Sequence, residues 1–302
     1  MSLLNIKNVK KSFGSNLVLN DINLTLEQND FYGLVGKNGS GKTTLINLIA
    51  GINKPDNGDI LFYDNINITQ FKHKIGLMPD SEGLYRNISG YDFLKYMGRL
   101  KKINLSNLQI SQLLEKVFLE VPQHLKIKHY SFGMKKKLAI AQTLIGNPDL
   151  IILDEPTSGV DPESAIYLRQ LFSDFHKEGK TILITSHNLS EIEKLCNKAS
   201  LLDNGKLTIS GELSTLLQNK EKSIKLLIQF KTTYPESELL KIMQKCSFEI
   251  HVNLSDSTLE IDCYSSDINN VLNFILQIKG MKIVDISTIK PDLEKLFFTD
   301  TM

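Results

Sequence analysis

Neither sign of charge dominates this chain of 302 residues, in which 35 lysines and arginines are offset by 34 aspartates and glutamates. The net charge of +1 excludes the broad basic field with which many proteins bind nucleic acid or an anionic membrane surface. Long apolar runs are also missing. The stretch 271–278 is among the longest, and it is too short to span a bilayer. The first residues lack the basic and then apolar layout of a signal peptide, so we expect a cytoplasmic protein.

Cysteine is scarce, with three residues far apart in the sequence: Cys196, Cys246 and Cys263. Their odd number and the lack of a CxxC pair exclude a disulfide framework and argue against a metal or redox role. We therefore expect reduced and mostly buried thiols. The remaining composition is that of an ordinary globular protein, with 41% apolar and 23% charged residues. The length allows one large domain or two ordinary ones.

The first part of the chain shows two strand patterns and then a strand followed by a helix. Apolar residues alternate in 3–9 and again in 17–27, with a turn at 14–16 between them. A short apolar run, 31–35, stops at a glycine, which is typical of a buried parallel strand. A helix is expected from about residue 42 to residue 50, with the next glycine as its cap.

Helical spacing dominates residues 89–129, where Tyr91 begins one apolar face and a second helix is expected after Ser106. Strand patterns return at 150–153 and 181–185, and a helical stretch at 163–177 separates them. Strand, helix and strand in this order predict a βαβ unit of a parallel sheet. The sequence thus indicates an α/β domain with a helical insertion.

After about residue 213 the pattern changes to β-α-β-β-α-β, the split βαβ arrangement of ferredoxin-like domains. The expected elements are strand 223–231, helix 235–245, strand 248–254, strand 257–264, helix 266–279, strand 281–288 and a last helix after Pro291. We therefore expect two domains, residues 1–215 and 216–302. A stretch rich in lysine and glutamate, around 218–223, is the expected linker.

Residues 36–44 match the phosphate-binding pattern GxxxxGK[ST] between an expected strand and an expected helix. They are Gly36, Lys37, Asn38, Gly39, Ser40, Gly41, Lys42, Thr43 and Thr44. The glycines let backbone N–H groups turn toward a phosphate, and the helix N-terminus adds its positive dipole. Lys42 would reach the β- and γ-phosphates, and Thr43 would offer its hydroxyl to Mg²⁺. The alternative is a chance glycine-rich turn, which the flanking elements argue against.

Asp154 and Glu155 directly follow the apolar strand 150–153. Ligands of open parallel sheets bind at the carboxyl ends of the strands. Asp154 suits the Mg²⁺ shell, directly or through water, and Glu155 suits polarising a water that attacks a phosphate. Alone, this pattern fits a strand that runs into a solvated acidic turn equally well. Together with the phosphate-binding loop, it predicts an enzyme that hydrolyses ATP.

Three further patterns make residues 1–215 resemble the nucleotide-binding subunits of ABC transporters. Residues 130–134, YSFGM, occupy the place of the family's signature, residues 158–161 match its D-loop, and His187 matches its switch histidine. The resemblance implies a P-loop nucleotide-binding domain with an antiparallel β subdomain and a helical subdomain at about 89–135. The small α+β ferredoxin-like domain would follow it. The implied cofactors are ATP and Mg²⁺.

The resemblance also implies that two chains share each ATP. Ser131 and Gly133 would meet the γ-phosphate of ATP held by a second such subunit, as a head-to-tail homodimer or heterodimer. Asp161 would belong to the same nucleotide interface, and His187 would contact the γ-phosphate and orient the water. Phe13 stands where the family stacks an aromatic ring on adenine, with an ordinary loop or core position as the alternative.

Two positions depart from the family's pattern. The signature usually reads LSGGQ, but here Phe132 is third and Met134 is fifth. Phenylalanine lacks glycine's backbone range, yet Ser131 and Gly133 are retained, so we expect a working site. Asp80 stands where the family usually has a glutamine that contacts Mg²⁺ and water and senses the permease. Aspartate can also ligate Mg²⁺, and a solvated loop residue is the alternative.

The end of the chain resembles that of bacterial ABC-2-type exporter ATPases, because residues 291–297, PDLEKLF, follow their "PsLEdvF" pattern. Together with GMKKKL at 133–138, it indicates the subfamily for export of, or immunity to, peptide antibiotics of the bacitracin or lantibiotic kind. The implied partner is a transmembrane permease on a separate chain, received near residues 80–100. Through it the chain would lie on the inner face of the cell membrane, without nucleic acid.

Two other functions are left as alternatives. A soluble ABC ATPase of translation or repair usually carries a second cassette or a long coiled-coil insertion, and this sequence has neither. A regulatory subunit that binds ATP with little turnover is the second alternative. Glu155 and His187 argue against it, whereas Phe132 and Asp80 leave it open.

Overall fold

The computed structural model describes residues 1–78, 85–216, 223–232, 249–253, 257–264, 267–278 and 280–289. Two compact units make up the chain, Met1–Gly211 and Glu212–Met302, and the boundary between them lies close to the one expected at 215 and 216. Among the helices that the structure describes, none combines the length and the hydropathy that a membrane span needs.

An antiparallel sheet begins the first unit. Strands β1 (Ser2–Phe13) and β2 (Asn16–Glu27) form the predicted hairpin around Gly14. Strands β4 (Asn57–Phe62) and β5 (Ile66–Asn67) extend it in the order β2-β1-β4-β5. The last two strands were not predicted, because they are short and lack a clear alternation.

A second sheet of six strands lies beside it, in the order β10-β9-β3-β8-β7-β6. The neighbours β9/β3, β3/β8, β8/β7 and β7/β6 run parallel. The three predicted strands, β3, β7 and β8, are buried along their whole length, as expected for strands covered on both faces. The six strands are β3 (Phe31–Val35), β6 (Ile75–Met78), β7 (Leu150–Asp154), β8 (Thr181–Ser186), β9 (Lys198–Asp203) and β10 (Lys206–Glu212).

Helix α1 (Lys42–Ile49) joins the two sheets. Its Leu45, Ile46, Leu48 and Ile49 belong to one buried cluster that contains residues of β1 and β2 on one side and of β3, β7 and β8 on the other. The helix begins directly after residues 36–41, so this core anchors the phosphate-binding loop. Helices α6 (Pro162–Lys177) and α7 (Leu189–Leu195) follow β7 and β8. The short α2 (Ile68–Phe71) precedes a 3-10 turn, Lys72–Lys74.

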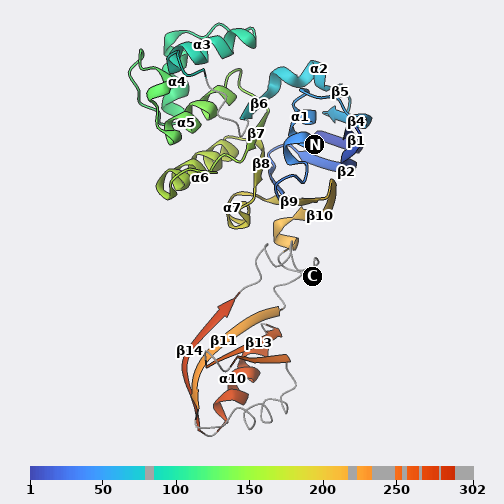
Figure 1. Ribbon diagram of the computed structural model, residues 1–302, viewed down its shortest axis with the longest axis vertical. Coiled ribbons are helices and arrows are strands. Elements are labelled where there is room, and N and C mark those ends of the chain that lie inside the picture. The colour runs from blue at the N-terminus through green and yellow to red at the C-terminus, as the bar shows by residue number, and fades with distance from the viewer. Residues whose placement is uncertain are drawn as a thin grey trace. The chain divides into compact units, whose positions relative to one another are not determined.

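Helices α3, α4 and α5 gather on the side of this unit away from the antiparallel sheet (Figure 1). Each of these helices begins after a serine cap: Ser89 before α3 (Gly90–Leu100), Ser106 before α4 (Asn107–Lys116), as predicted, and Ser131 before α5 (Phe132–Thr143). Each serine hydroxyl accepts a backbone N–H of the first turn, which stabilises a helix start. A second 3-10 turn, Ile127–His129, leads into the last of these caps.

The second unit is a sheet in the order β12-β13-β11-β14 with helix α10 against it. All three strand pairs are antiparallel. Strand β13 lies between β11 and β12, and β11 lies between β13 and β14, as in a split βαβ fold. The elements are β11 (Ser223–Thr232), β12 (Glu249–Asn253), β13 (Thr258–Tyr264), α10 (Ile268–Leu276) and β14 (Met281–Ile289). The expected helices at 235–245 and after Pro291, and Cys246, lie outside the described residues.

Candidate nucleotide-binding and catalytic site

The phosphate-binding loop connects β3 to α1, as predicted. Gly41 precedes the helix with φ +107°, a conformation that favours glycine. A β-carbon added to Gly36 would collide with the backbone oxygen of Leu202, on neighbouring β9. Both glycines are therefore required by the path of the loop. This path turns the loop onto the positive end of α1, which suits an anion.

Lys42 is folded back into the loop and is only 7% exposed. Its Nζ donates to the backbone oxygens of Gly36 at 2.6 Å and Lys37 at 3.2 Å, and it lies 4.0 Å from Oε1 of Glu155. The ammonium group is held by fixed carbonyl dipoles next to a carboxylate. The geometry places this cation where the loop would hold a phosphate chain.

Asp154 ends β7 and accepts a hydrogen bond on each carboxylate oxygen. Thr43 Oγ1 donates to Oδ2 at 3.2 Å, and Thr185 Oγ1 donates to Oδ1 at 2.6 Å. The carboxylate is 3% exposed. The structure thus brings together the two described residues that we predicted as metal ligands, Thr43 and Asp154. The third, Asp80, lies outside the described residues.

Glu155 is the next residue, and its carboxylate meets His187, which we predicted as the switch histidine. His187 Nδ1 lies 2.8 Å from Oε2 of Glu155. An ionised carboxylate can only accept, so Nδ1 carries the proton in this pair. The Glu155 backbone is fixed by its N–H, which is bonded to Thr185, and by its carbonyl oxygen, which accepts from Lys136 Nζ at 3.1 Å. Among the described residues, Oε1 of Glu155 has no hydrogen-bond partner.

A cavity of about 200 Å³ lies over the loop. Its lining consists of Val18, Asn38, Gly39, Gly41, Lys42, Thr43, Thr44, Asp154 and Glu155. The size fits a phosphate chain better than a whole nucleotide, since drug-sized ligands fill cavities of roughly 300–1,000 Å³. Phe13 does not line it and is 51% exposed at the end of the β1–β2 hairpin, where Lys11 Nζ lies 5.5 Å from its ring centre.

Ser131, Gly133 and Asp161 also lie outside this lining. Ser131 and Gly133 stand at the start of α5, and the Ser131 hydroxyl accepts the N–H of Met134 at 3.2 Å. Asp161 caps α6 and accepts the N–H of Ser164 at 2.9 Å, and this backbone hydrogen bond lowers the pKa of its exposed carboxyl. One chain therefore does not assemble all of the predicted residues around one cavity.

Phe132 sits in an ordinary helical backbone. It is the first residue of α5 and is absent from the described residues with positive φ. This position therefore does not use the backbone range that only glycine has. Its ring packs against Gly159, where an added β-carbon would lie 3.3 Å from ring carbons, and Lys136 Nζ lies 5.6 Å from the ring centre.

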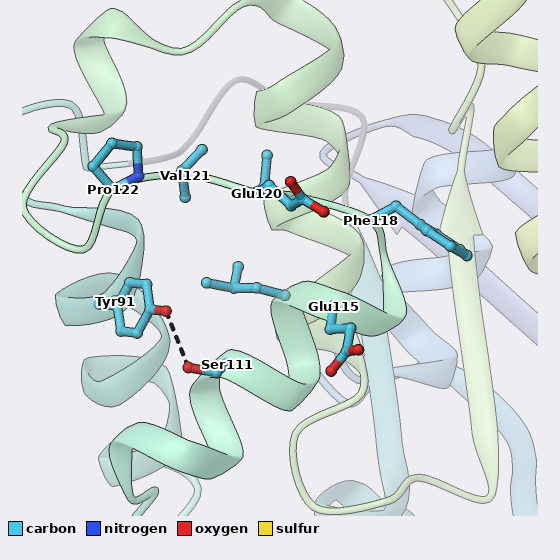
Figure 2. Close-up of a pocket in the computed structure, with 9 residues that line it drawn as sticks. Tyr91, Ser111, Glu115, Phe118, Glu120, Val121 and Pro122 are labelled. Atoms are coloured by element: carbon cyan, nitrogen blue, oxygen red, sulfur yellow. Dashed lines mark hydrogen bonds between the residues drawn. The ribbon is translucent and has the colours of Figure 1, made fainter.

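A larger cavity, of about 820 Å³, lies between α3, α4 and the loop 118–122 (Figure 2). It is lined by Tyr91, Ser111, Leu114, Glu115, Phe118, Leu119, Glu120, Val121 and Pro122, and contains none of the predicted site residues. Tyr91 and Ser111 bridge the two helices through a 3.1 Å hydrogen bond. Phe118 points away from the cavity and contacts the ring of Tyr167 edge-on, which joins the helical region to α6.

Thr185 is a residue of the site that the sequence did not reveal, because it reads only as part of an apolar strand. It is fully buried, and its hydroxyl donates to Asp154 and accepts the N–H of Glu155 at 3.0 Å. The single hydroxyl thus fixes both acidic residues. The only signal in the sequence was a threonine near the end of an expected strand.

We expect Thr185→Val to lower the free energy of unfolding by about 1–3 kcal/mol, because valine keeps the shape and leaves two buried groups without this partner. Urea unfolding measures this free energy. The transition to follow is the one that added ATP shifts to higher urea concentration, because ATP stabilises the unit that binds it. The control is Thr208→Val, an exposed threonine of β10, for which we expect a change within about 0.5 kcal/mol. Equal stability of the Thr185→Val variant and the native chain would contradict this role.

A glycine-rich loop between a buried parallel strand and a helix, next to a strand that ends in a buried aspartate, defines a P-loop nucleotide-binding protein. The sequence pattern of the ABC transporter family matches residues 19–158. A lantibiotic transport ATP-binding protein, SrtF of Streptococcus pyogenes, is 37% identical over 210 residues, which are 70% of this chain and 91% of SrtF.

Two other proteins are similar over more of their length. The bacitracin transport ATP-binding protein BcrA of Enterococcus faecalis is 30% identical over 302 residues, which are 98% of this chain and 95% of BcrA. A bacterial ABC transporter cassette solved as a dimer, MJ0796, is 25% identical with a TM-score of 0.64, over 70% of this chain and 99% of that one. The chain therefore belongs to the ATP-binding proteins of ABC transporters, a family of transport ATPases.

Proposed function

We propose that two copies of this chain, or this chain and a similar one, pair head to tail and hydrolyse the ATP bound between them. This hydrolysis would drive the export of a peptide antibiotic or a related drug or lipid-like compound. The observation that carries the catalytic assignment is the 2.8 Å pair of Glu155 and His187. Glu155 lines the cavity over the phosphate-binding loop, where its carboxylate can orient and polarise a water. His187 holds that carboxylate and is 63% exposed, so its other ring nitrogen is free to face a phosphate.

Magnesium is the cofactor that we propose beside ATP. The Thr43 hydroxyl and the Asp154 carboxylate lie 3.2 Å apart at the mouth of the loop, and Mg²⁺ takes one or two such oxygens together with phosphate oxygens. The described residues contain no group of three or more His, Cys, Asp and Glu that could hold a metal, which fits an ion held largely by the phosphates. When bound, the ion would neutralise phosphate charge. Thr43 and Asp154 would hold it.

The second half of the site is proposed to come from the partner chain. Ser131 and Gly133 open a helix of twelve residues, so a hydroxyl and N–H groups with a positive helix end face an incoming γ-phosphate. In their own chain they do not line the cavity of the loop. Asp161, which caps the helix after the acidic strand, would stand at the same interface.

A permease on another chain is the proposed membrane partner, and through it this chain would lie on the inner face of the cell membrane. The surface that we propose for contact includes Tyr85, Tyr96 and Leu100, all exposed apolar side chains. The rings of Tyr85 and Tyr96 meet edge-on at 5.6 Å. Exposed aromatic groups of this kind are enriched where proteins meet.

The proposed substrate class is supported by relatives whose names refer to lantibiotic and bacitracin transport. The test is to produce the chain with its permease in a sensitive bacterium and to measure the growth-inhibiting concentration of bacitracin and of a lantibiotic. We expect it to rise for at least one of them, and Glu155→Gln to remove the increase. Co-purification with ribosomes or DNA instead of a membrane protein would support the alternative of a soluble ABC ATPase. ATP binding with no turnover, even with the permease, would support the regulatory alternative.

A further inference from the structure

Glu191 is a buried carboxylate that none of the assignments above uses. It lies in the first turn of α7 and is 2% exposed. Its backbone N–H is held by the side chain of Asn188, which caps the helix. Burying a carboxylate is costly unless hydrogen bonds compensate, so its contacts indicate what it does.

One oxygen of Glu191 connects two segments that leave neighbouring strands. Its Oε2 accepts from Thr157 Oγ1 at 2.9 Å and from Ser186 Oγ at 2.9 Å. Thr157 follows Glu155 by two residues, and Ser186 directly precedes His187. The Ser186 hydroxyl also accepts the N–H of Asn188 at 3.0 Å, which fixes its orientation. The carboxylate therefore joins the segment of the catalytic glutamate to that of the switch histidine.

The sheet holds the N–H of Glu155 through Thr185 of β8, but the side chains of Glu155 and His187 meet beyond the paired residues. The last registered pair between β7 and β8 is Asp154 with Thr185. Glu155 and His187 both lie beyond it, and Glu155 has φ +48°, outside strand geometry. The 2.8 Å contact between their side chains thus depends on what holds the two segments after the strands end. Besides Thr185, which bonds to the N–H of Glu155, Glu191 bonds to a residue of each segment.

The second oxygen of Glu191 differs from the first in its surroundings. Oε1 is buried and has no hydrogen-bond partner among the described residues. A buried acceptor without a partner costs free energy. The carboxyl group is held by the two hydrogen bonds that its Oε2 accepts from Thr157 and Ser186.

We propose that Glu191 is a positioning residue, which holds Glu155 and His187 in register for hydrolysis by bonding to Thr157 and Ser186 at once. The inference rests on the catalytic roles proposed for Glu155 and His187. Small displacements of catalytic groups cost large factors in rate, so losing this connection lowers turnover. ATP binding depends on the loop at 36–44, which Glu191 does not touch.

The test is the substitution Glu191→Leu in the full-length chain. We expect kcat for ATP to fall about tenfold or more in the folded variant, with KM within about twofold. Glu191→Gln keeps an acceptor oxygen for the two hydroxyls and should recover part of the rate. Glu193→Gln removes the same charge from the same helix and serves as the control, with an unchanged rate.

A double-mutant cycle identifies the contacts. Thr157→Val with Ser186→Ala should lower kcat to a similar degree in the native chain and have little further effect in the Glu191→Leu chain. If Glu191→Leu does not fold, the pair of hydroxyl substitutions decides the question alone. A native kcat in these variants would overturn the inference, as would additive losses. Glu155→Gln is measured in parallel, because native turnover in that variant would overturn the proposed catalytic site instead.

Discussion

Glu155→Gln should leave ATP binding intact and lower ATP hydrolysis by about a hundredfold or more, which is the size of contribution that a positioned general base makes. Glutamine has the same shape and accepts or donates hydrogen bonds, but it cannot draw a proton from water. Steady-state phosphate release measures the turnover, and equilibrium binding of labelled ATP measures the affinity.

The structure gives the physical reason why this substitution should affect hydrolysis but not ATP binding. Glu155 contributes one edge of the cavity, whereas the loop residues and Lys42 contribute most of its lining. Lys42 Nζ is held by two backbone oxygens of the loop and lies 4.0 Å from Glu155 Oε1, so it keeps its place when that oxygen becomes an amide group. Loss of the negative charge next to this cation should, if anything, favour an added phosphate.

Glu163→Gln is the matched control, because Glu163 is an exposed glutamate in the first turn of α6, close in sequence and outside the cavity. We expect it to retain the native rate. Native turnover in the Glu155→Gln variant would remove the assignment of Glu155 and with it the proposed mechanism. Loss of ATP binding in that variant would show that Glu155 acts in binding.

The local part of the site could be predicted from the sequence because local patterns determine it. The loop at 36–44 has its strand and helix as direct neighbours, and Asp154 and Glu155 follow a strand with no interruption. The ends of parallel strands meet at one edge, so topology brings the segments that carry Asp154, Glu155 and His187 to the loop, while the exact contact of Glu155 and His187 depends on the residues around them.

The supporting residues could not be predicted, because their partners are distant in the sequence. Thr185 reads as a strand residue, Lys136 as part of a basic run and Glu191 as a polar helix residue. Their roles arise only when β7 and β8 lie side by side and α5 and α7 pack near the strand ends. Strands β4, β5, β6, β9 and β10 were missed for a related reason, since pairing with neighbours rather than their own pattern makes them strands.

The proposed division of the site between two chains predicts the second large effect. Lys42→Ala and Ser131→Asp should each lower hydrolysis by about a hundredfold or more, since each removes or opposes a group that stabilises phosphate charge. Aspartate caps a helix as well as serine does, so α5 should remain intact while a negative charge faces the γ-phosphate. Phosphate release by each purified variant tests these losses.

Mixing the two inactive variants should restore activity. In a head-to-tail pair, the mixed dimer combines both defects in one site and leaves the other site with a native loop and a native signature. Random exchange makes about half of the dimers mixed, and one of two sites works in each, so we expect about a quarter of the native rate. The rate is measured after the variants have been allowed to exchange subunits.

A second mixture tests whether the geometry is assigned correctly. Lys42 and Glu155 lie in the same half of the site, with Nζ and Oε1 4.0 Å apart. A mixed dimer of Lys42→Ala and Glu155→Gln therefore has one defect in each of its two sites and should stay inactive. Recovery in the first mixture but not in the second requires Ser131 to act across the interface, on ATP held by the partner. If the first mixture shows only the summed activity of its two components, each chain completes its own site and the head-to-tail arrangement is wrong.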